Sequence, residues 1–150
     1  MLEEKIFNDY KESMKNRDKV RAQTLSFLRS QLKNLAIAQK KEKLEDNLVI
    51  DVIRQQIKQR QEAILKFEQA NRNDLSQKEK QELDVLKSYL PPEISLEELG
   101  KIIDDIILQT QAMGLKDMGK VMKEAKIKIS SRIDNQTLSQ FIKDKLANIK

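Results

Sequence analysis

Apolar residues recur at helical spacing along most of the chain. Leucines 25, 28, 32 and 35 alternate steps of three and four residues, which keeps all four on one face of a helix that begins after the predicted N-cap Asp18. Similar spacing predicts three further helices before residue 91, the last two starting near Asp46 and at Asn73 or Asp74. Their apolar stripes are Leu2, Ile6, Tyr10 and Met14; Val49, Ile53, Ile57, Ile64 and Phe67; and Leu83, Leu86 and Leu90.

A diproline at positions 91 and 92 interrupts the helical pattern. The first proline disfavours a helical residue before it, and neither proline can donate a helical hydrogen bond. Ser95 and Glu98 then form a capping-box pattern, in which the serine caps the new helix and the glutamate reaches back. We therefore predict two domains, 1–91 and 92–150, joined by a proline hinge.

Three shorter helices are predicted beyond this hinge. The second is expected to begin at Asp117 and the third to be capped by Asp134. Their apolar positions are Leu96, Leu99, Ile103, Ile106 and Ile107; Met118, Val121, Met122 and Ala125; and Leu138, Phe141, Ile142 and Leu146. The predicted fold is all-α, with about four N-terminal helices and a small C-terminal three-helix bundle.

One polar residue falls in an apolar stripe. Arg60 occupies a position of the third helix where the spacing calls for an apolar side chain. An ion pair with an acidic residue of the fourth helix, such as Glu82, accounts for it, and anchoring a ligand is the alternative.

Composition removes several kinds of chemistry. The 150 residues include no cysteine and no histidine, which excludes disulfides, thiolate nucleophiles and Ser-His-Asp or Cys-His catalysis. The adjacent carboxylates Asp104-Asp105 and Glu97-Glu98 point about 100° apart on a helix, and no phosphate- or dinucleotide-binding glycine motif occurs. We predict a protein with no catalytic residues, no cofactor, no metal and no membrane association. Acidic residues in the first 15 positions argue against a signal or transit peptide, so a cytoplasmic location is expected.

Positive charge concentrates in two places, although the net charge is only +5. Nine basic residues against two acidic ones lie between Lys15 and Lys43, and either track a phosphate backbone or solvate a helix. The second cluster comprises Lys116, Lys120 and Lys123, which share one face of the sixth predicted helix around Gly119, with Arg132 beyond it. Helix-start N–H groups and a glycine favour phosphate contact. Close packing of two helices at Gly119 is the alternative.

Several short motifs are distributed along the chain. The clearest is DMGKVM at 117–122, and the others are MKNRDK at 14–19, KQR at 58–60, ANRNDL at 70–75, EL at 82–83 and YLP at 89–91. Together they resemble the YqeY family, which is similar to the tail domain of GatB, a subunit of the glutamine-dependent tRNA amidotransferase. The resemblance runs over essentially the whole chain and implies a C-terminal bundle like the GatB tail, which is thought to help hold tRNA without being catalytic.

Two departures from the family pattern concern glycines. Ser131 and Asn135 stand in the family's GRADG element, where Arg132 and Asp134 are retained, and Asn71 also replaces a glycine. Because serine tolerates turn geometry less freely than glycine, the replacement at Ser131 argues against a close nucleic-acid contact there.

These features lead to one main hypothesis and two alternatives. The main one is a non-catalytic tRNA-binding or tRNA-amidotransferase-related accessory protein that contacts phosphates through Lys116, Gly119, Lys120, Lys123 and Arg132. Its partner would be tRNA or a tRNA-dependent enzyme. The first alternative is a protein–protein adaptor that docks through Met118, Val121 and Met122. The second is carbon–nitrogen ligase activity with glutamine as amido donor, which the family resemblance alone suggests.

Overall fold

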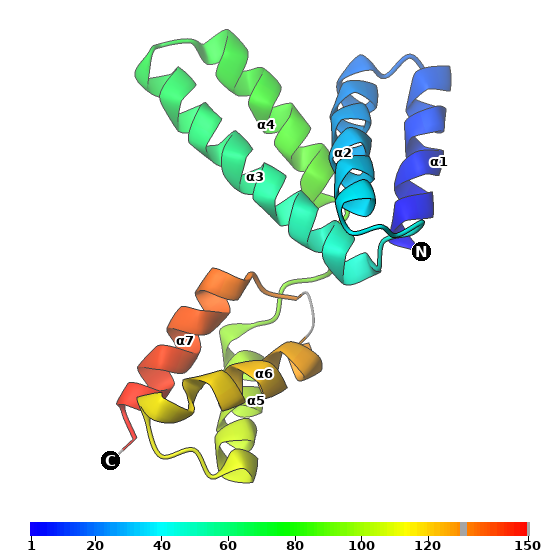
Figure 1. Ribbon diagram of the computed structural model, residues 1–150. Helices are drawn as coiled ribbons and strands as arrows, with labels where there is room; N and C mark the ends of the chain where they lie inside the picture. Colours follow the sequence, from blue (N-terminus) through cyan, green and yellow to red (C-terminus); the bar gives the residue numbers. More distant parts are fainter. Residues whose placement is uncertain (130–131, 150) are drawn as a thin grey trace. The chain divides into compact units, whose positions relative to one another are not determined.

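The computed structural model describes residues 1–129 and 132–149 (Figure 1). Over these residues the chain forms seven α-helices and one three-residue 3₁₀ turn, η1, with no strand, which confirms the predicted all-α class. The elements are α1 (Leu2–Lys15), α2 (Lys19–Ala38), α3 (Asp46–Gln69), α4 (Asn73–Lys87), α5 (Leu96–Thr110), η1 (Leu115–Asp117), α6 (Met118–Ile129) and α7 (Asn135–Ala147). None of the helices described is long and apolar enough to span a bilayer.

The helices group into two compact units, Met1–Leu90 and Pro91–Lys150. Each unit has its own apolar core, and no residue belongs to both cores. The units are therefore described separately, as unit 1 and unit 2.

Unit 1 consists of two antiparallel helix pairs, α1 with α2 and α3 with α4 (Figure 1). Its core contains the predicted leucine stripe of α2, where Leu25 and Leu28 are fully buried and Leu35 is partly buried. Around these lie apolar side chains of the other three helices and the α2–α3 loop: Ile6, Leu44, Val49, Ile53, Ile57, Ile64, Leu83 and Leu86. The helical stripes predicted for α2, α3 and α4 thus face one common core.

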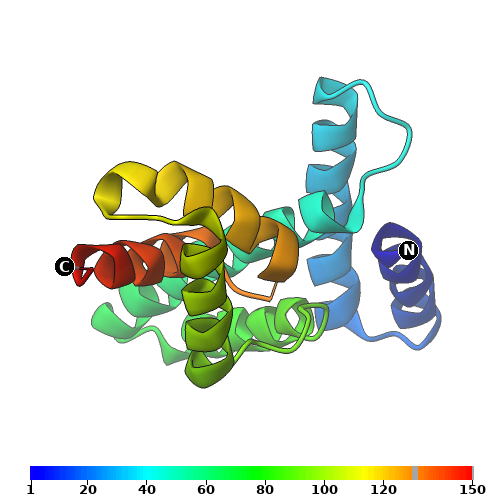
Figure 2. The same cartoon turned by 90° about the horizontal axis from the view of Figure 1, so that it is seen from below.

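The loop between α2 and α3 is attached to the start of α1. The backbone N–H of Leu44 donates to Glu3 Oε2 at 2.9 Å, and the N–H of Leu2 donates to Asp46 Oδ1 at 3.0 Å. The loop arches out between α2 and α3 in Figure 2. The fully buried side chain of Leu44 attaches it to the core of unit 1.

The Arg60 ion pair with Glu82 is confirmed. Arg60 Nη1 contacts Glu82 Oε2 and lies 3.1 Å from Glu79 Oε2, so two carboxylates of α4 surround one guanidinium of α3. The Arg60 and Glu82 side chains are only 13% and 10% exposed. Such a pair must stay intact, because removal of either partner would leave a buried charge.

Unit 2 is a small bundle in which α6 and α7 lie across α5 (Figure 2). Its core takes in the predicted apolar residues of all three helices: Leu99, Ile103, Ile106, Val121, Ala125, Ile129, Leu138, Ile142 and Leu146. Lys145 of α7 also pairs with Asp104 of α5 at 3.1 Å.

Three predicted N-caps are confirmed. The side chains of Asp18, Ser95 and Asp134 accept hydrogen bonds from the N–H groups of Arg21, Glu98 and Thr137. The reciprocal half of the predicted capping box is wrong, because the Glu98 carboxylate accepts instead from Arg132.

Two stripe positions were predicted wrongly. Met14 is 58% exposed, and Ser13 is buried in its place, donating to the carbonyl of Tyr10. Leu96 is 70% exposed because it is the first residue of α5, where no preceding turn covers it. In both cases the periodicity was extended to a helix end, where burial depends on the neighbouring segments.

Four helix ends place a residue other than glycine in the left-handed region. Arg17, Lys40, Asn71 and Gln111 have φ between 55° and 58°, each just after a helix. The next N–H donates back five residues at every one of these ends, as from Arg72 to the carbonyl of Phe67, which is the Schellman pattern. Asn71 keeps the turn because asparagine tolerates this conformation.

Candidate nucleic-acid interface

The candidate site is built at the start of α6. The 3₁₀ turn Leu115–Asp117 runs directly into α6, so the helix begins at Met118, one residue after the predicted Asp117. Asp117 fixes the turn by accepting a hydrogen bond from the N–H of Met113 at 2.8 Å. Lys116 consequently lies in the 3₁₀ turn rather than on the helix, immediately before the first turn of α6.

Lys116, Lys120 and Lys123 are all exposed. Helical spacing places Lys120 and Lys123 on the side of α6 opposite the buried Val121 and Ala125. Lys120 Nζ lies 3.5 Å from the carbonyl of Thr110, a long contact that leaves its charge unneutralised. Within residues 1–129 and 132–149, neither Lys116 nor Lys123 takes part in an ion pair. The cluster therefore presents free positive charge to solvent.

Gly119 lies between these lysines and is exposed. A Cβ atom built at Gly119 would meet nothing within 4 Å. Close packing of a second helix at this residue, the alternative explanation for the glycine, is therefore wrong. The glycine instead leaves the start of α6 without side-chain cover, while the preceding 3₁₀ turn engages the first backbone group there, since the N–H of Met118 donates to the carbonyl of Leu115.

Arg132, the fifth predicted contact, has an acidic partner. Its Nη1 and Nη2 donate to the two carboxylate oxygens of Glu98, both at 3.1 Å. The carbonyl of Arg132 also accepts from the N–H of Ile94 at 3.3 Å. This residue connects the segment before α7 to the start of α5. The neighbouring Ser131 lies outside the described residues.

The surface predicted for a protein adaptor is part of the core. Val121 is fully buried, while Met118 and Met122 are partly buried against the same apolar cluster. The prediction that a partner docks through these three residues is therefore wrong, because the partner would have to displace the interior of unit 2. The exposed apolar side chains near α6 are instead Met113, Leu115 and Ile127.

The basic run from Lys15 to Lys43 is divided by the fold. It extends from the end of α1, along the 20 residues of α2, to the following loop. Several of its members have partners: Arg21 lies 3.4 Å from Asp9, and Lys43 lies 3.6 Å from Glu4. Two of its nine basic side chains are thus paired with carboxylates.

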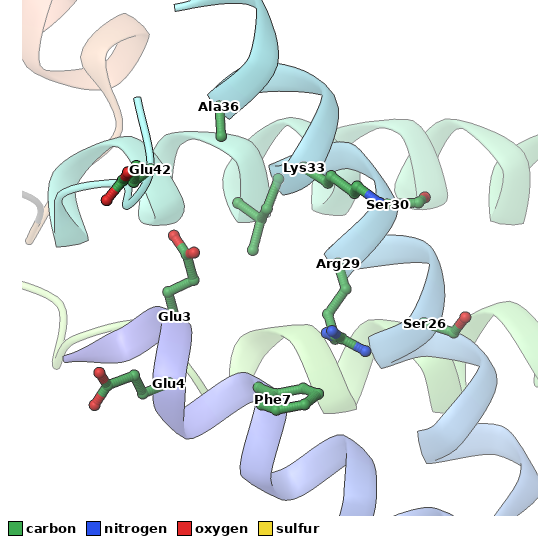
Figure 3. A pocket seen from close by; sticks show the side chains of 10 residues that line it. Glu3, Glu4, Phe7, Ser26, Arg29, Ser30, Lys33, Ala36 and Glu42 are labelled. Carbon is green, nitrogen blue, oxygen red and sulfur yellow. The ribbon is translucent and has the colours of Figure 1, made fainter. Parts of the chain in front are cut away.

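A pocket of about 520 Å³ lies within unit 1, between α1, α2 and the loop that follows α2 (Figure 3). The Arg29 guanidinium points toward the Phe7 ring, 4.2 Å from its centroid. Glu3, Glu4 and Glu42 lie across the pocket from Lys33 and Arg29. Its walls carry both signs of charge, so it has no single preference for an anion.

Sequence reasoning missed Gln56. This α3 side chain is 2% exposed, and neither its Oε1 nor its Nε2 has a hydrogen-bond partner among the described residues. It lines a pocket of about 330 Å³ together with Phe27, Arg60 and Glu79. The signal was present in the stripe of α3, where position 56 continues the spacing of Val49 and Ile53 toward Arg60.

No group of acidic side chains suited to hold a metal ion occurs in the part of the chain that the structure describes. Tyr89 is a buried titratable side chain. Burial, and then its hydrogen bond to Asp9 at 2.7 Å, raise the pKa of this phenol above its ordinary value. Arg21 Nη2 donates to the Tyr89 oxygen at 3.4 Å. This trio joins α1, α2 and the end of α4, and its role is structural.

Comparison with known proteins gives one family match. The model of the family described as Yqey-like protein matches residues 3–146. A relative from Candida glabrata, named altered inheritance of mitochondria protein 41, mitochondrial, is 31% identical over 69% of this chain and 58% of its own length. The protein of the same name from Kluyveromyces lactis is 31% identical over 75% of this chain and 65% of its own. That from Vanderwaltozyma polyspora is 27% identical over 95% and 74%. The chain thus spans less than two thirds of the first two relatives.

Proposed function

We propose that this chain, which belongs to the YqeY-like protein family, is a non-catalytic accessory protein that binds tRNA through the start of α6. The observation that carries the proposal is the exposed cluster of Lys116, Lys120 and Lys123 around the uncovered Gly119. Positive side chains without acidic partners release counterions from a phosphate backbone on binding. The missing side chain at Gly119 lets a phosphate approach the first turn of α6 closely.

Arg132 is not a direct contact in this proposal. Both of its terminal nitrogens donate to Glu98, and the residue follows the end of α6 (Met118–Ile129), whereas the lysine cluster lies at the start of that helix. Lys116, Lys120 and Lys123 are the direct contacts. Recognition by such a surface would depend on the shape and charge of structured RNA, because lysines bind phosphates as point charges.

Titration of labelled total tRNA with the purified chain tests the proposal, with fluorescence anisotropy as the readout and duplex DNA of equal length as control. Saturable binding that is stronger for tRNA than for DNA and weakens with salt is expected. Absence of tRNA binding at low salt would overturn it. We also propose a cytoplasmic location. Because the relatives are named as mitochondrial, fractionation of the native host is the direct test of this location.

An adaptor remains the second candidate because three apolar side chains are exposed near the same helix. Met113 is 72% exposed and Ile127 68%, with Leu115 close to them in sequence. A protein captured by the chain that stays bound after nuclease treatment and in high salt would favour the adaptor. Amide transfer is not part of the proposal, and glutaminase or ATP hydrolysis by the purified chain would contradict the non-catalytic assignment.

A further inference from the structure

A second site lies in unit 1, in the pocket of about 520 Å³ between α1, α2 and the loop that follows α2 (Figure 3). This volume falls within the range of small-ligand sites, about 300–1,000 Å³. Phe7 of α1 and Leu32 and Ala36 of α2 supply the apolar part of its wall. Phe7 is 40% exposed, so part of the ring remains accessible to a ligand.

The charged side chains of this pocket are separated by sign. Glu3 and Glu42 lie on one side, and Arg29 and Lys33 lie on the other (Figure 3). Among the residues that the structure describes, Arg29, Lys33 and Glu42 take part in no ion pair. Opposite charges therefore face each other across the pocket without neutralising each other, and a ligand that lies between them can contact both.

Two of the charged groups are held in place by other contacts. The Arg29 guanidinium lies 4.2 Å from the centroid of the Phe7 ring and 5.0 Å from that of Tyr10. These rings attract the cation without removing its charge. On the opposite side, Glu3 Oε2 accepts from the N–H of Leu44 at 2.9 Å. Groups that are already positioned lose less conformational entropy when a ligand binds, which favours affinity.

The balance of charge restricts the ligand. The third carboxylate of the lining, Glu4, is compensated by Lys43 of the loop, 3.6 Å away. Two carboxylates and two cations remain on the facing sides, so neither a simple anion nor a simple cation is favoured. A molecule that carries both an ammonium group and a carboxylate pairs with both sides, and its carboxylate matches the two-point geometry of a guanidinium.

We infer that this pocket binds a zwitterion of the amino-acid type, with its ammonium group toward Glu3 and Glu42, its carboxylate toward Arg29, and an apolar side chain against Leu32. A free amino acid and a short peptide share this chemistry. The site lies in unit 1 and does not depend on the contact proposed for α6.

Amide chemical shifts of the full chain test the inference, with leucine, leucyl-leucine, N-acetylleucine and leucinamide as probes. We expect leucine or leucyl-leucine to shift residues 7, 29, 32 and 36 saturably. N-acetylleucine lacks the ammonium group and leucinamide lacks the carboxylate, so each should bind about tenfold more weakly than leucine, the order expected for one lost charged hydrogen bond. Tighter binding of leucyl-leucine than of leucine identifies a peptide as the source, and the reverse identifies the free amino acid.

Two substitutions assign the two ends of the ligand. Arg29→Met removes the guanidinium, and should weaken leucine binding about tenfold while leaving leucinamide binding unchanged. Glu3→Gln keeps an acceptor for the N–H of Leu44, and should weaken leucine binding while leaving N-acetylleucine binding unchanged. The matched controls are Lys19→Met and Glu12→Gln, at exposed positions of α2 and α1 outside the lining, and both should bind every probe as the native chain does.

The variant at position 3 keeps the test valid if the variant at position 29 fails to fold. A substitution that merely disturbed the structure would weaken all probes alike, whereas loss of one charge affects only the probes that carry its partner. No shift with leucine or leucyl-leucine, equal affinity for the blocked and unblocked probes, or native binding in the two pocket variants would overturn the inference.

Discussion

Arg132 and Glu98 form a two-point ion pair, with both guanidinium Nη atoms 3.1 Å from the carboxylate oxygens. The two residues are 34 positions apart, and their pairing joins the start of α5 to the segment before α7. Arg132 thereby stabilises unit 2, which distinguishes it from the unpaired lysines of α6.

A double-mutant cycle of Arg132→Ala and Glu98→Ala should give a coupling energy of about 0.5–1 kcal/mol, as measured by urea unfolding. This coupling energy is modest because the side chains are 38% and 47% exposed. The two-point geometry places it in the upper part of the range for exposed pairs. The pair Lys101–Glu97 on α5, at 3.7 Å and 76% and 83% exposed, is the control and should couple by roughly 0.3 kcal/mol or less. A coupling of zero for Arg132 and Glu98 would contradict the structural role.

Glu82→Ala should lower the free energy of unfolding by roughly 3 kcal/mol, because it leaves Arg60 buried with only Glu79 as partner. Replacing both partners, as in Arg60→Met with Glu82→Leu, should recover most of the loss. Lys80→Ala breaks an exposed pair with Glu68 between the same two helices and should cost about 0.5 kcal/mol or less. Urea unfolding of the variants measures all three, and equal losses for Glu82→Ala and Lys80→Ala would contradict a buried pair.

Stability should fall above about pH 10 because of Tyr89. Its pKa is raised in the folded chain, so the phenol stays protonated while an unfolded tyrosine ionises near pH 10. The contribution of the protonated Tyr89 phenol to the free energy of unfolding is therefore complete below about pH 10. It is lost as the pH rises toward the pKa of the folded chain. Unfolding between pH 8 and 11 should show a steeper decline for the native chain than for Tyr89→Phe. If the free energies of unfolding of the two proteins changed in parallel with pH, the raised pKa of Tyr89 would be contradicted.

Most of the fold follows from local patterns. The stripe of Leu25, Leu28 and Leu32 and the caps at Asp18 and Ser95 act over one or two helical turns, so the sequence alone predicts them correctly. Even Arg60 could be matched to Glu82, because α3 and α4 are consecutive and therefore expected to pack together.

The errors concern features that tertiary contacts decide. Spacing alone put Met14 rather than Ser13 on the buried side of α1. Met118 and Met122 fit the apolar spacing of α6, but spacing could not decide between a core position and a docking surface. The Arg132–Glu98 pair and the unpartnered amide of Gln56 depend on which helices meet, and a stripe does not carry this information. Within the candidate site all three lysines are exposed, but only Lys120 and Lys123 share a face of α6, because Lys116 lies in the 3₁₀ turn. Their role in binding stays a prediction.

Gly119→Ala separates folding from function. The new methyl group meets nothing within 4 Å and the residue is helical, so stability should rise by about 0.5–1 kcal/mol. If RNA approaches the open helix start, the same methyl group should weaken tRNA binding. Thermal unfolding and anisotropy of the same preparation measure both effects. Higher stability with unchanged tRNA affinity would contradict a close contact at this glycine.

The most direct test of the central claim is the tRNA affinity of Lys120→Glu with Lys123→Glu, measured by anisotropy across a salt series. The matched control is Lys101→Glu with Lys143→Glu, which makes the same change in net charge at exposed positions on α5 and α7. If α6 contacts the phosphates, the first variant should bind about tenfold more weakly or worse, with a salt slope reduced by about 2, and the control should bind nearly as the native chain does. Equal losses in the two variants, or no loss in either, would contradict a tRNA interface on α6.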